Sequence, residues 1–102
     1  MTQTIVKPKV RPNTQLAEPP MFRVIYINDN QTPMDFVIGS LIEHFEYNEV
    51  TAEQVTMEIH NAGAAIVAVL PYEIAEQKGI EITISARGQG FPLQIKLEPA
   101  NI

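Results

Sequence analysis

The sequence predicts an α+β fold, a two-layer sandwich in which three helices cover one face of a three-stranded antiparallel sheet. Apolar residues alternate in two short segments, and a short apolar run between Gly63 and Pro71 has the length of a buried strand. Two further segments carry apolar residues at helical spacing. The predicted order is strand, helix, helix, strand, helix, strand, in which the third helix has a competing interpretation.

Residues 21–27, MFRVIYI, are rich in β-forming residues and are predicted to form a strand that the turn residues NDNQ end. The first helix follows, with Thr32 as its cap, Pro33 at its first position and Asp35 three residues after the cap. Its apolar stripe is predicted to consist of Met34, Val37, Ile38, Leu41 and Phe45.

The second helix is predicted to begin at Thr51, because Thr51 and Gln54 form a capping-box pattern, and to end at Gly63. Thr56 and His60 then lie one turn apart on the flank of this helix. Its core stripe is predicted to consist of Ala52, Val55, Ile59 and Ala62.

The last third of the chain contains one strand, one ambiguous segment and a final strand. Residues 64–71 are predicted to form a buried strand. The next segment looks helical at first, but its second half, GIEITIS, alternates like a strand, so local patterns leave both structures open. The segment GFPLQIKLEP is predicted to be a strand, because Leu93, Ile95 and Leu97 alternate with polar residues.

Length and charge divide the chain into a short extension and one domain. Residues 1–20 contain four prolines and no sustained periodicity, which predicts a flexible extension before a core domain of residues 21–102. The extension carries three basic residues and one acidic residue, a net charge of +2, whereas the core carries four basic and eleven acidic residues, a net charge of −7. An acidic core argues against nucleic acid as a partner and suits a cationic ligand or a basic surface.

The composition also indicates where the protein works. The chain contains no cysteine, which fits a reducing compartment. No apolar run approaches the ~20 residues that a membrane helix needs, and no hydrophobic signal segment is visible at the N-terminus. We therefore expect a cytoplasmic protein without membrane partners, and a monomer, since no apolar heptad repeat demands a second chain.

The sequence offers little for catalysis. Ser40 and Ser85 are the only serines, and neither lies in a nucleophile elbow. His44 and His60 lack metal-ligand spacing, and no phosphate-binding glycine loop is present. A hydrolase built on Asp29 and His60 would have no nucleophile. We expect no enzyme activity, no metal and no cofactor.

Binding residues are easier to find. Asn28 and Asp29 end a strand beside a helix start, and His60 lies late in the second helix. Together they offer oxygen and nitrogen acceptors, which suit an ammonium group. The alternative is that the Asn-Asp-Asn run is a simple turn and that His60 is a boundary residue. An apolar pocket beside these acceptors is expected from Met34, Val37 and Ile59.

Three segments resemble the ClpS family, the adaptors of AAA+ Clp proteases. The run FRVIYINDNQTPMDFVIGSLIEHFEY is similar to the family's opening, in which an Asn-Asp-Asp turn precedes Thr-Pro-Met, an acidic residue and Phe-Val. The run TMEIHNAGAAIVAV resembles a second landmark, a His followed by a small loop and Gly, and PLQIKLEPA resembles the end. The resemblance extends from about Phe22 to Ala100.

The resemblance implies an adaptor that binds proteins with destabilising N-terminal residues, namely Leu, Phe, Tyr or Trp, and delivers them to a Clp ATPase. An alternative is a regulatory domain that docks on the ATPase without reading N-termini. The resemblance also implies that the third helix runs through KGIEITIS. Residues implied to hold the α-amino group are Asn28, Asp29 and His60. Residues implied to border the side-chain pocket are Thr32, Met34, Val37, Thr56, Ile59 and Leu93. Docking on the ATPase N-domain is implied for Glu73 and Lys78, and contact with the unfoldase for residues 1–20.

Two positions depart from the family pattern. Asn30 replaces the second Asp of the turn, which removes one negative charge near the expected ligand. Thr56 stands where the family commonly has a Met that acts as a gate at the pocket. Because Thr is smaller and polar, we hypothesise a reshaped pocket with an altered side-chain preference.

Overall fold

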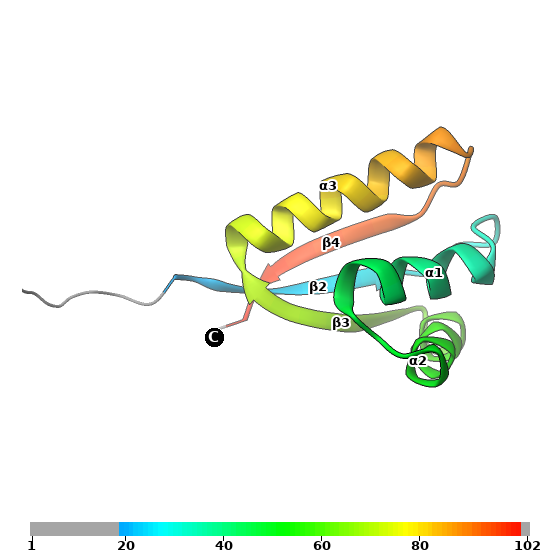
Figure 1. Ribbon diagram of the computed structural model, residues 1–102, viewed down its shortest axis with the longest axis horizontal. Helices are drawn as coiled ribbons and strands as arrows, with labels where there is room; N and C mark the ends of the chain where they lie inside the picture. The colour runs from blue at the N-terminus through cyan, green and yellow to red at the C-terminus, as the bar shows by residue number, and fades with distance from the viewer. Residues whose placement is uncertain (1–18, 101–102) are drawn as a thin grey trace, which may run out of the picture.

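The computed structural model describes residues 19–100, and it confirms the predicted α+β fold and element order (Figure 1). Its elements are β2 (Met21–Ile27), α1 (Met34–Phe45), α2 (Glu49–Ala62), β3 (Ala64–Pro71), α3 (Tyr72–Gly88) and β4 (Gln94–Pro99). The central strand β2 pairs antiparallel with β3 on one side and with β4 on the other. The predicted extension lies outside the described residues except for Pro19 and Pro20.

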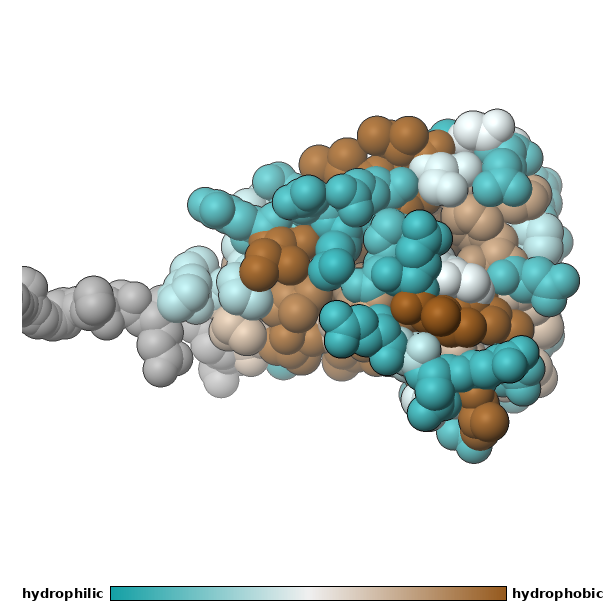
Figure 2. All heavy atoms as spheres, in the orientation of Figure 1, coloured by the Kyte–Doolittle hydropathy of each residue, from teal (hydrophilic) through white to brown (hydrophobic). Residues whose placement is uncertain are grey.

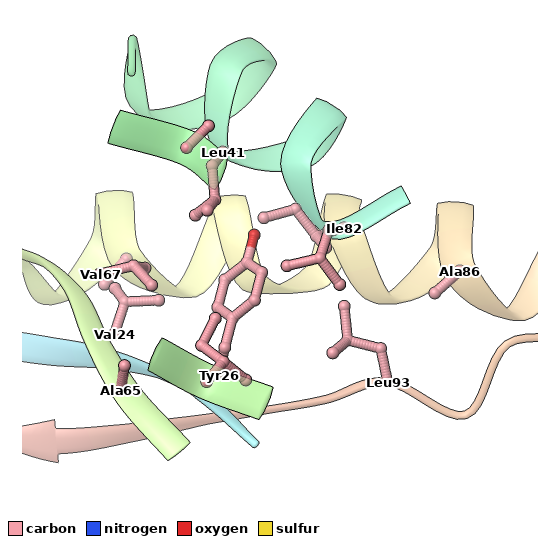
Figure 3. Packing of buried hydrophobic residues seen from close by; sticks show 12 residues of the cluster. Val24, Tyr26, Leu41, Ala65, Val67, Ile82, Ala86 and Leu93 are labelled. Carbon is pink, nitrogen blue, oxygen red and sulfur yellow. The ribbon is translucent and has the colours of Figure 1, made fainter. Parts of the chain in front are cut away.

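The hydrophobic core lies between the sheet and the helices. Val24 and Tyr26 of the central strand are fully buried, and every helix adds buried side chains to the same cluster. Figure 3 shows the Tyr26 ring pointing away from the sheet, with Leu41 and Ile82 beyond it. Alternate residues of β3 face the opposite way, since Ile66 is 55% exposed.

A buried hydrogen bond joins the sheet to α1. The Ser40 hydroxyl donates to the Val37 carbonyl at 2.8 Å, so the Tyr26 hydroxyl donates to Ser40 Oγ, also at 2.8 Å. Burial raises the pKa of Tyr26, which keeps this hydroxyl protonated and able to donate. The bond connects the middle of α1 to the central strand.

The helix α1 begins one residue later than predicted, so the predicted cap residue was wrong. Thr32 does not cap the helix, because its hydroxyl donates to Asp29 Oδ2 at 2.8 Å. Pro33 occupies the cap position instead, and its carbonyl accepts the N–H groups of Phe36 and Val37 at 3.1 and 3.3 Å. The competing partner of Thr32 lies in the preceding turn, which the capping pattern alone does not reveal.

The predicted capping box of α2 was also wrong. The helix begins at Glu49, and the side chain of Asn48 accepts the Thr51 N–H at 2.8 Å. Thr51 therefore lies in the first turn rather than before it. Asn caps helices at least as well as Thr, so Asn48, which comes earlier in the chain, caps the helix. The predicted stop at Gly63 is confirmed.

The ambiguous segment is helical throughout, as the family resemblance implied. Ala75, Ile82 and Ala86 are fully buried and lie on one face of α3 at helical spacing. The other two isoleucines of the alternating run, Ile80 and Ile84, are 52% and 66% exposed. Packing of one face of α3 against the sheet therefore favours the helix, although the local pattern resembles a strand.

Gly63 ends α2 in a left-handed conformation, with φ of +92°, that disfavours other residues. A Cβ added there would have no atom within 4 Å, so the cost of Gly63→Ala comes from the backbone alone. We expect it to lower the free energy of unfolding by about 1–2 kcal/mol, as measured by urea denaturation.

Gly39→Ala is the matched control for this prediction. Gly39 lies inside α1, has no positive φ, and its added Cβ would also have no atom within 4 Å. Alanine should therefore stabilise the protein there by up to about 1 kcal/mol. Equal effects of the two substitutions would contradict the assigned role of the Gly63 conformation.

Candidate functional site

One cavity collects nearly all the residues that the sequence singled out for binding. It has a volume of about 180 Å³ and lies where the turn after β2 meets the start of α1 and the end of α2. In Figure 1 these segments lie at the end of the domain opposite the start of β2. The predicted residues that line it are Asn28, Asp29, Thr32, Met34, Val37, Thr56, Ile59 and His60.

Strand pairing brings the two halves of the cavity together. Ile27 pairs with Ala64 across the sheet, and the Asn28 N–H donates to the Gly63 carbonyl at 2.9 Å. The turn after β2 is thereby joined to the residue that ends α2. His60 lies less than one helical turn before Gly63, so the pairing places it beside residues 28 and 29.

Asp29 builds the turn that forms one wall. Its Oδ1 accepts the N–H groups of Gln31 and Thr32, both at 2.7 Å, and its Oδ2 accepts the Thr32 hydroxyl at 2.8 Å. Burial alone would raise the pKa of Asp29, but these hydrogen bonds and the positive charge of Arg87 outweigh it and lower the pKa. The carboxylate therefore stays ionised at neutral pH.

The same contacts leave Asp29 able to bind a ligand. An ionised carboxylate has about four lone-pair positions, and three of them are used within the turn. One position on Oδ2 remains for a donor in the cavity. Asp29 thus combines two roles, since it holds the backbone of the turn and offers a negative charge to a cation.

The inner walls of the cavity are apolar. Val37 and Ile59 are almost completely buried, whereas Met34 at the rim is 40% exposed. Thr56 is 3% exposed, so the prediction that it lies on the flank of α2 was wrong. Its hydroxyl donates to the Ala52 carbonyl at 2.7 Å and offers no free proton to a ligand. The burial pattern of α2 is rotated from the predicted stripe, because Ala62 is exposed and Val55 is partly buried.

His60 lies at the rim of the cavity and is exposed. Among residues 19–100, no side chain or backbone group forms a hydrogen bond or ion pair with its ring. A neutral His60 can therefore present one nitrogen as an acceptor to a ligand. The cavity consequently has polar acceptors at its mouth and apolar walls inside.

Leu93 is not among the residues that line this cavity, so its implied place at the border of the pocket stays a prediction. It is 1% exposed and belongs to the core, where Figure 3 shows it next to Ile82. Asn30, which the sequence analysis placed near the expected ligand without assigning it a role, also lines the cavity. Arg87 does not line it, but its charge adds to the hydrogen bonds from Gln31 and Thr32 that lower the pKa of Asp29. No local sequence signal connects Arg87 to position 29.

Glu73 and Lys78 lie on α3 and do not line the cavity. Glu73 is exposed in the first turn of the helix, whereas Lys78 is partly buried. The Lys78 ammonium lies 5.8 Å from the centre of the Phe45 ring, a cation–π contact that connects α3 with α1. These two residues therefore belong to a different surface.

A second hollow, of about 260 Å³, lies between α1 and α3 and is lined by Asp35, Glu43 and His44 among others. The ring of His44 is 3.7 Å from a Glu81 carboxylate oxygen. Within residues 19–100, no three His, Asp or Glu side chains are grouped so that they could hold a metal ion. The helices in the same part of the chain are all too short or too polar to cross a membrane.

The fold and the cavity define a small α+β domain with a cavity that combines polar acceptors and apolar walls. Residues 17–96 match the family model for the ATP-dependent Clp protease adaptor protein ClpS. This match covers most of the chain, and the chain therefore belongs to the ClpS family.

Individual relatives agree with this assignment. The ClpS 1 adapter of Bradyrhizobium diazoefficiens is 37% identical over 97% of this chain and 98% of its own length. The ClpS adapter of Campylobacter jejuni subsp. doylei is 39% identical over 92% of this chain and 98% of its own length. The solved structure of Agrobacterium tumefaciens ClpS2 bound to L-phenylalaninamide has a TM-score of 0.78 and 37% identity. It covers 81% of this chain and is itself covered completely.

Proposed function

We propose that this protein is an adaptor that binds proteins by a bulky hydrophobic N-terminal residue and delivers them to a Clp AAA+ protease. The observation that carries the proposal is the cavity with acceptors at its mouth and apolar walls inside. A peptide N-terminus presents an ammonium group and a side chain on the same carbon atom. The similar ClpS2 protein of Agrobacterium tumefaciens binds L-phenylalaninamide, which has both groups.

The polar residues of the cavity would recognise the α-amino group. Asn28, Asp29 and His60 offer acceptors, and the ionised Asp29 adds a negative charge. The α-amino group has a pKa of about 7.7–8.0 in model peptides, so it is mostly cationic at neutral pH. Acetylation removes the charge and a donor, and it leaves acceptors unpaired at a cost of ~1–3 kcal/mol.

The apolar walls would bind the first side chain. Transfer of a Leu or Phe side chain from water into such a pocket contributes roughly 1.5–3 kcal/mol. The size of the side chain then sets the preference among Leu, Phe, Tyr and Trp. The proposed pocket residues are Thr32, Met34, Val37, Thr56 and Ile59.

Delivery requires a second surface, which we assign to α3. Glu73 and Lys78 are proposed to dock on the ATPase N-domain, and residues 1–20 are proposed to engage the unfoldase. The core domain of residues 21–102 would act as a cytoplasmic monomer, without a cofactor, nucleic acid or membrane partner. The competing function is a regulator that docks on the ATPase but does not bind N-termini.

Fluorescence anisotropy with short peptides distinguishes the two functions. A peptide with a free N-terminal Phe is expected to bind, and its acetylated form to bind at least about fivefold more weakly. His60→Ala should weaken the free peptide more than the acetylated one, because only the free form presents an ammonium group. If neither peptide binds while the ATPase N-domain does, the regulatory function replaces the adaptor function.

A further inference from the structure

An apolar groove of about 290 Å³, the α3–β4 groove, lies between α3 and β4. It shares no residue with the cavity proposed to bind peptide N-termini. Its walls are formed by Ile80 and Ile84 of α3 and by Ile95 and Leu97 of β4. Both isoleucines of α3 are more than half exposed. Figure 2 shows hydrophobic side chains gathered over α3 at the top of the view. Contiguous exposed apolar patches often mark interaction surfaces.

Glu76 lines this groove, and two more glutamates lie beside it on α3. A shallow surface along α3 is lined by Glu73, Glu76 and Glu81, and it shares Glu76 and Ile80 with the groove. The groove therefore combines an apolar floor with a negative side. Its best occupant is an extended segment that carries apolar and basic side chains.

The chain enters the core beside this groove. The Pro20 carbonyl accepts the N–H of Tyr72, the first residue of α3, at 3.0 Å. Phe22 pairs with Pro99, the last residue of β4. The segment before Pro19 is thus attached between the start of one wall and the end of the other.

That segment has the matching chemistry. Residues 4–11 read TIVKPKVR, in which Ile5, Val6 and Val10 are interspersed with Lys7, Lys9 and Arg11. Eight peptide steps separate Arg11 from Pro19, and an extended chain covers about 28 Å over that length. The 17 residues of α3 measure about 25 Å. Residues 4–11 can therefore reach every part of the groove.

We propose that residues 4–11 bind in the α3–β4 groove of the same molecule. Ile5, Val6 and Val10 contact the apolar floor, while the three basic side chains face Glu76 and the neighbouring glutamates of α3. The inference does not depend on the proposed function. It has one consequence for that function, because the bound segment covers the side of α3 that carries Glu73, the residue assigned to ATPase docking.

Paramagnetic relaxation in the full-length protein tests the proposal. The chain has no cysteine, so Thr4→Cys provides a single attachment point for a nitroxide label. Amide signals of residues 79–84 and 95–97 are expected to lose intensity when the label is oxidised. Signals of residues 64–67, on the opposite edge strand, are expected to keep theirs. Equal losses on both edge strands, or losses confined to residues next to Pro20, overturn the proposal.

Two sets of variants and one mixing experiment complete the test. Reversal of the three tail charges, Lys7→Glu, Lys9→Glu and Arg11→Glu, should restore the signals without touching the core. Ile84→Gln should also restore them, whereas Val69→Gln, at an exposed apolar position of β3, should not. Losses that appear when spin-labelled and isotope-labelled molecules are mixed, and only then, place the segment on a second copy and overturn the intramolecular proposal.

Discussion

Replacing Asp29 with alanine is expected to weaken binding of a peptide with a free N-terminal Phe by about 10- to 100-fold. The substitution removes the negative charge at the mouth of the cavity. It also removes the acceptor of three hydrogen bonds, from the N–H groups of Gln31 and Thr32 and from the Thr32 hydroxyl. Fluorescence anisotropy with the free and acetylated peptides measures the loss, and thermal unfolding monitors the fold.

Asp29→Asn separates the charge from the turn. The amide oxygen can still accept from the Gln31 and Thr32 N–H groups, but the charge is gone. If recognition depends on charge, this variant should bind almost as weakly as Asp29→Ala. Asp35→Asn is the matched control, because Asp35 carries the same charge in the first turn of α1 without lining the cavity. Normal binding by Asp29→Asn would mean that Asp29 acts only through the turn.

Thr56→Met is expected to change which N-terminal residues are accepted. Thr56 is a buried wall of a cavity of about 180 Å³, so the longer Met side chain must take up part of that volume. Overpacking of this kind costs about 1–3 kcal/mol, so the largest and the β-branched first residues should lose about 5- to 100-fold relative to Leu. Twenty peptides that differ only in their first residue provide the ranking.

Thr56→Val is the control for the loss of the hydroxyl. Valine has nearly the shape of threonine, and the Thr56 hydroxyl donates to the Ala52 carbonyl instead of pointing to a ligand as a free donor. The ranking of first residues should therefore stay as in the unchanged protein. An unchanged ranking in Thr56→Met as well would show that position 56 does not select the side chain.

Several features of the site could be predicted because they depend on short segments of sequence. The turn chemistry of residues 28–30 and the Gly63 stop were visible locally, and both halves of the cavity follow from them. The two halves come together because β2 pairs with β3. The sequence pattern predicts both strands but not the register of this pairing. Arg87 could not be found in this way, because its effect on Asp29 acts between residues that are far apart in the sequence.

The burial of individual side chains was harder to predict than the positions of helices and strands along the chain. Thr56 was expected on a flank, yet it is buried because α2 turns that side toward the cavity and satisfies the hydroxyl within the helix. Leu93 was expected at the border of the pocket, and the structure shows it 1% exposed within the core cluster. In both cases contacts with segments distant in the sequence decide the burial, and no local pattern contains those contacts.

The sequence by itself determined the order of the other elements, the acidic core, the basic extension and the polar turn beside apolar residues, because these depend on composition and short-range periodicity. Only the tertiary structure decided the state of residues 79–86. Packing against the sheet buries Ile82 alone and leaves Ile80 and Ile84 at the surface, which no strand-like alternation predicts. The helical structure also creates the α3–β4 groove, because it directs Ile80 and Ile84 to a different side of α3 from Ile82.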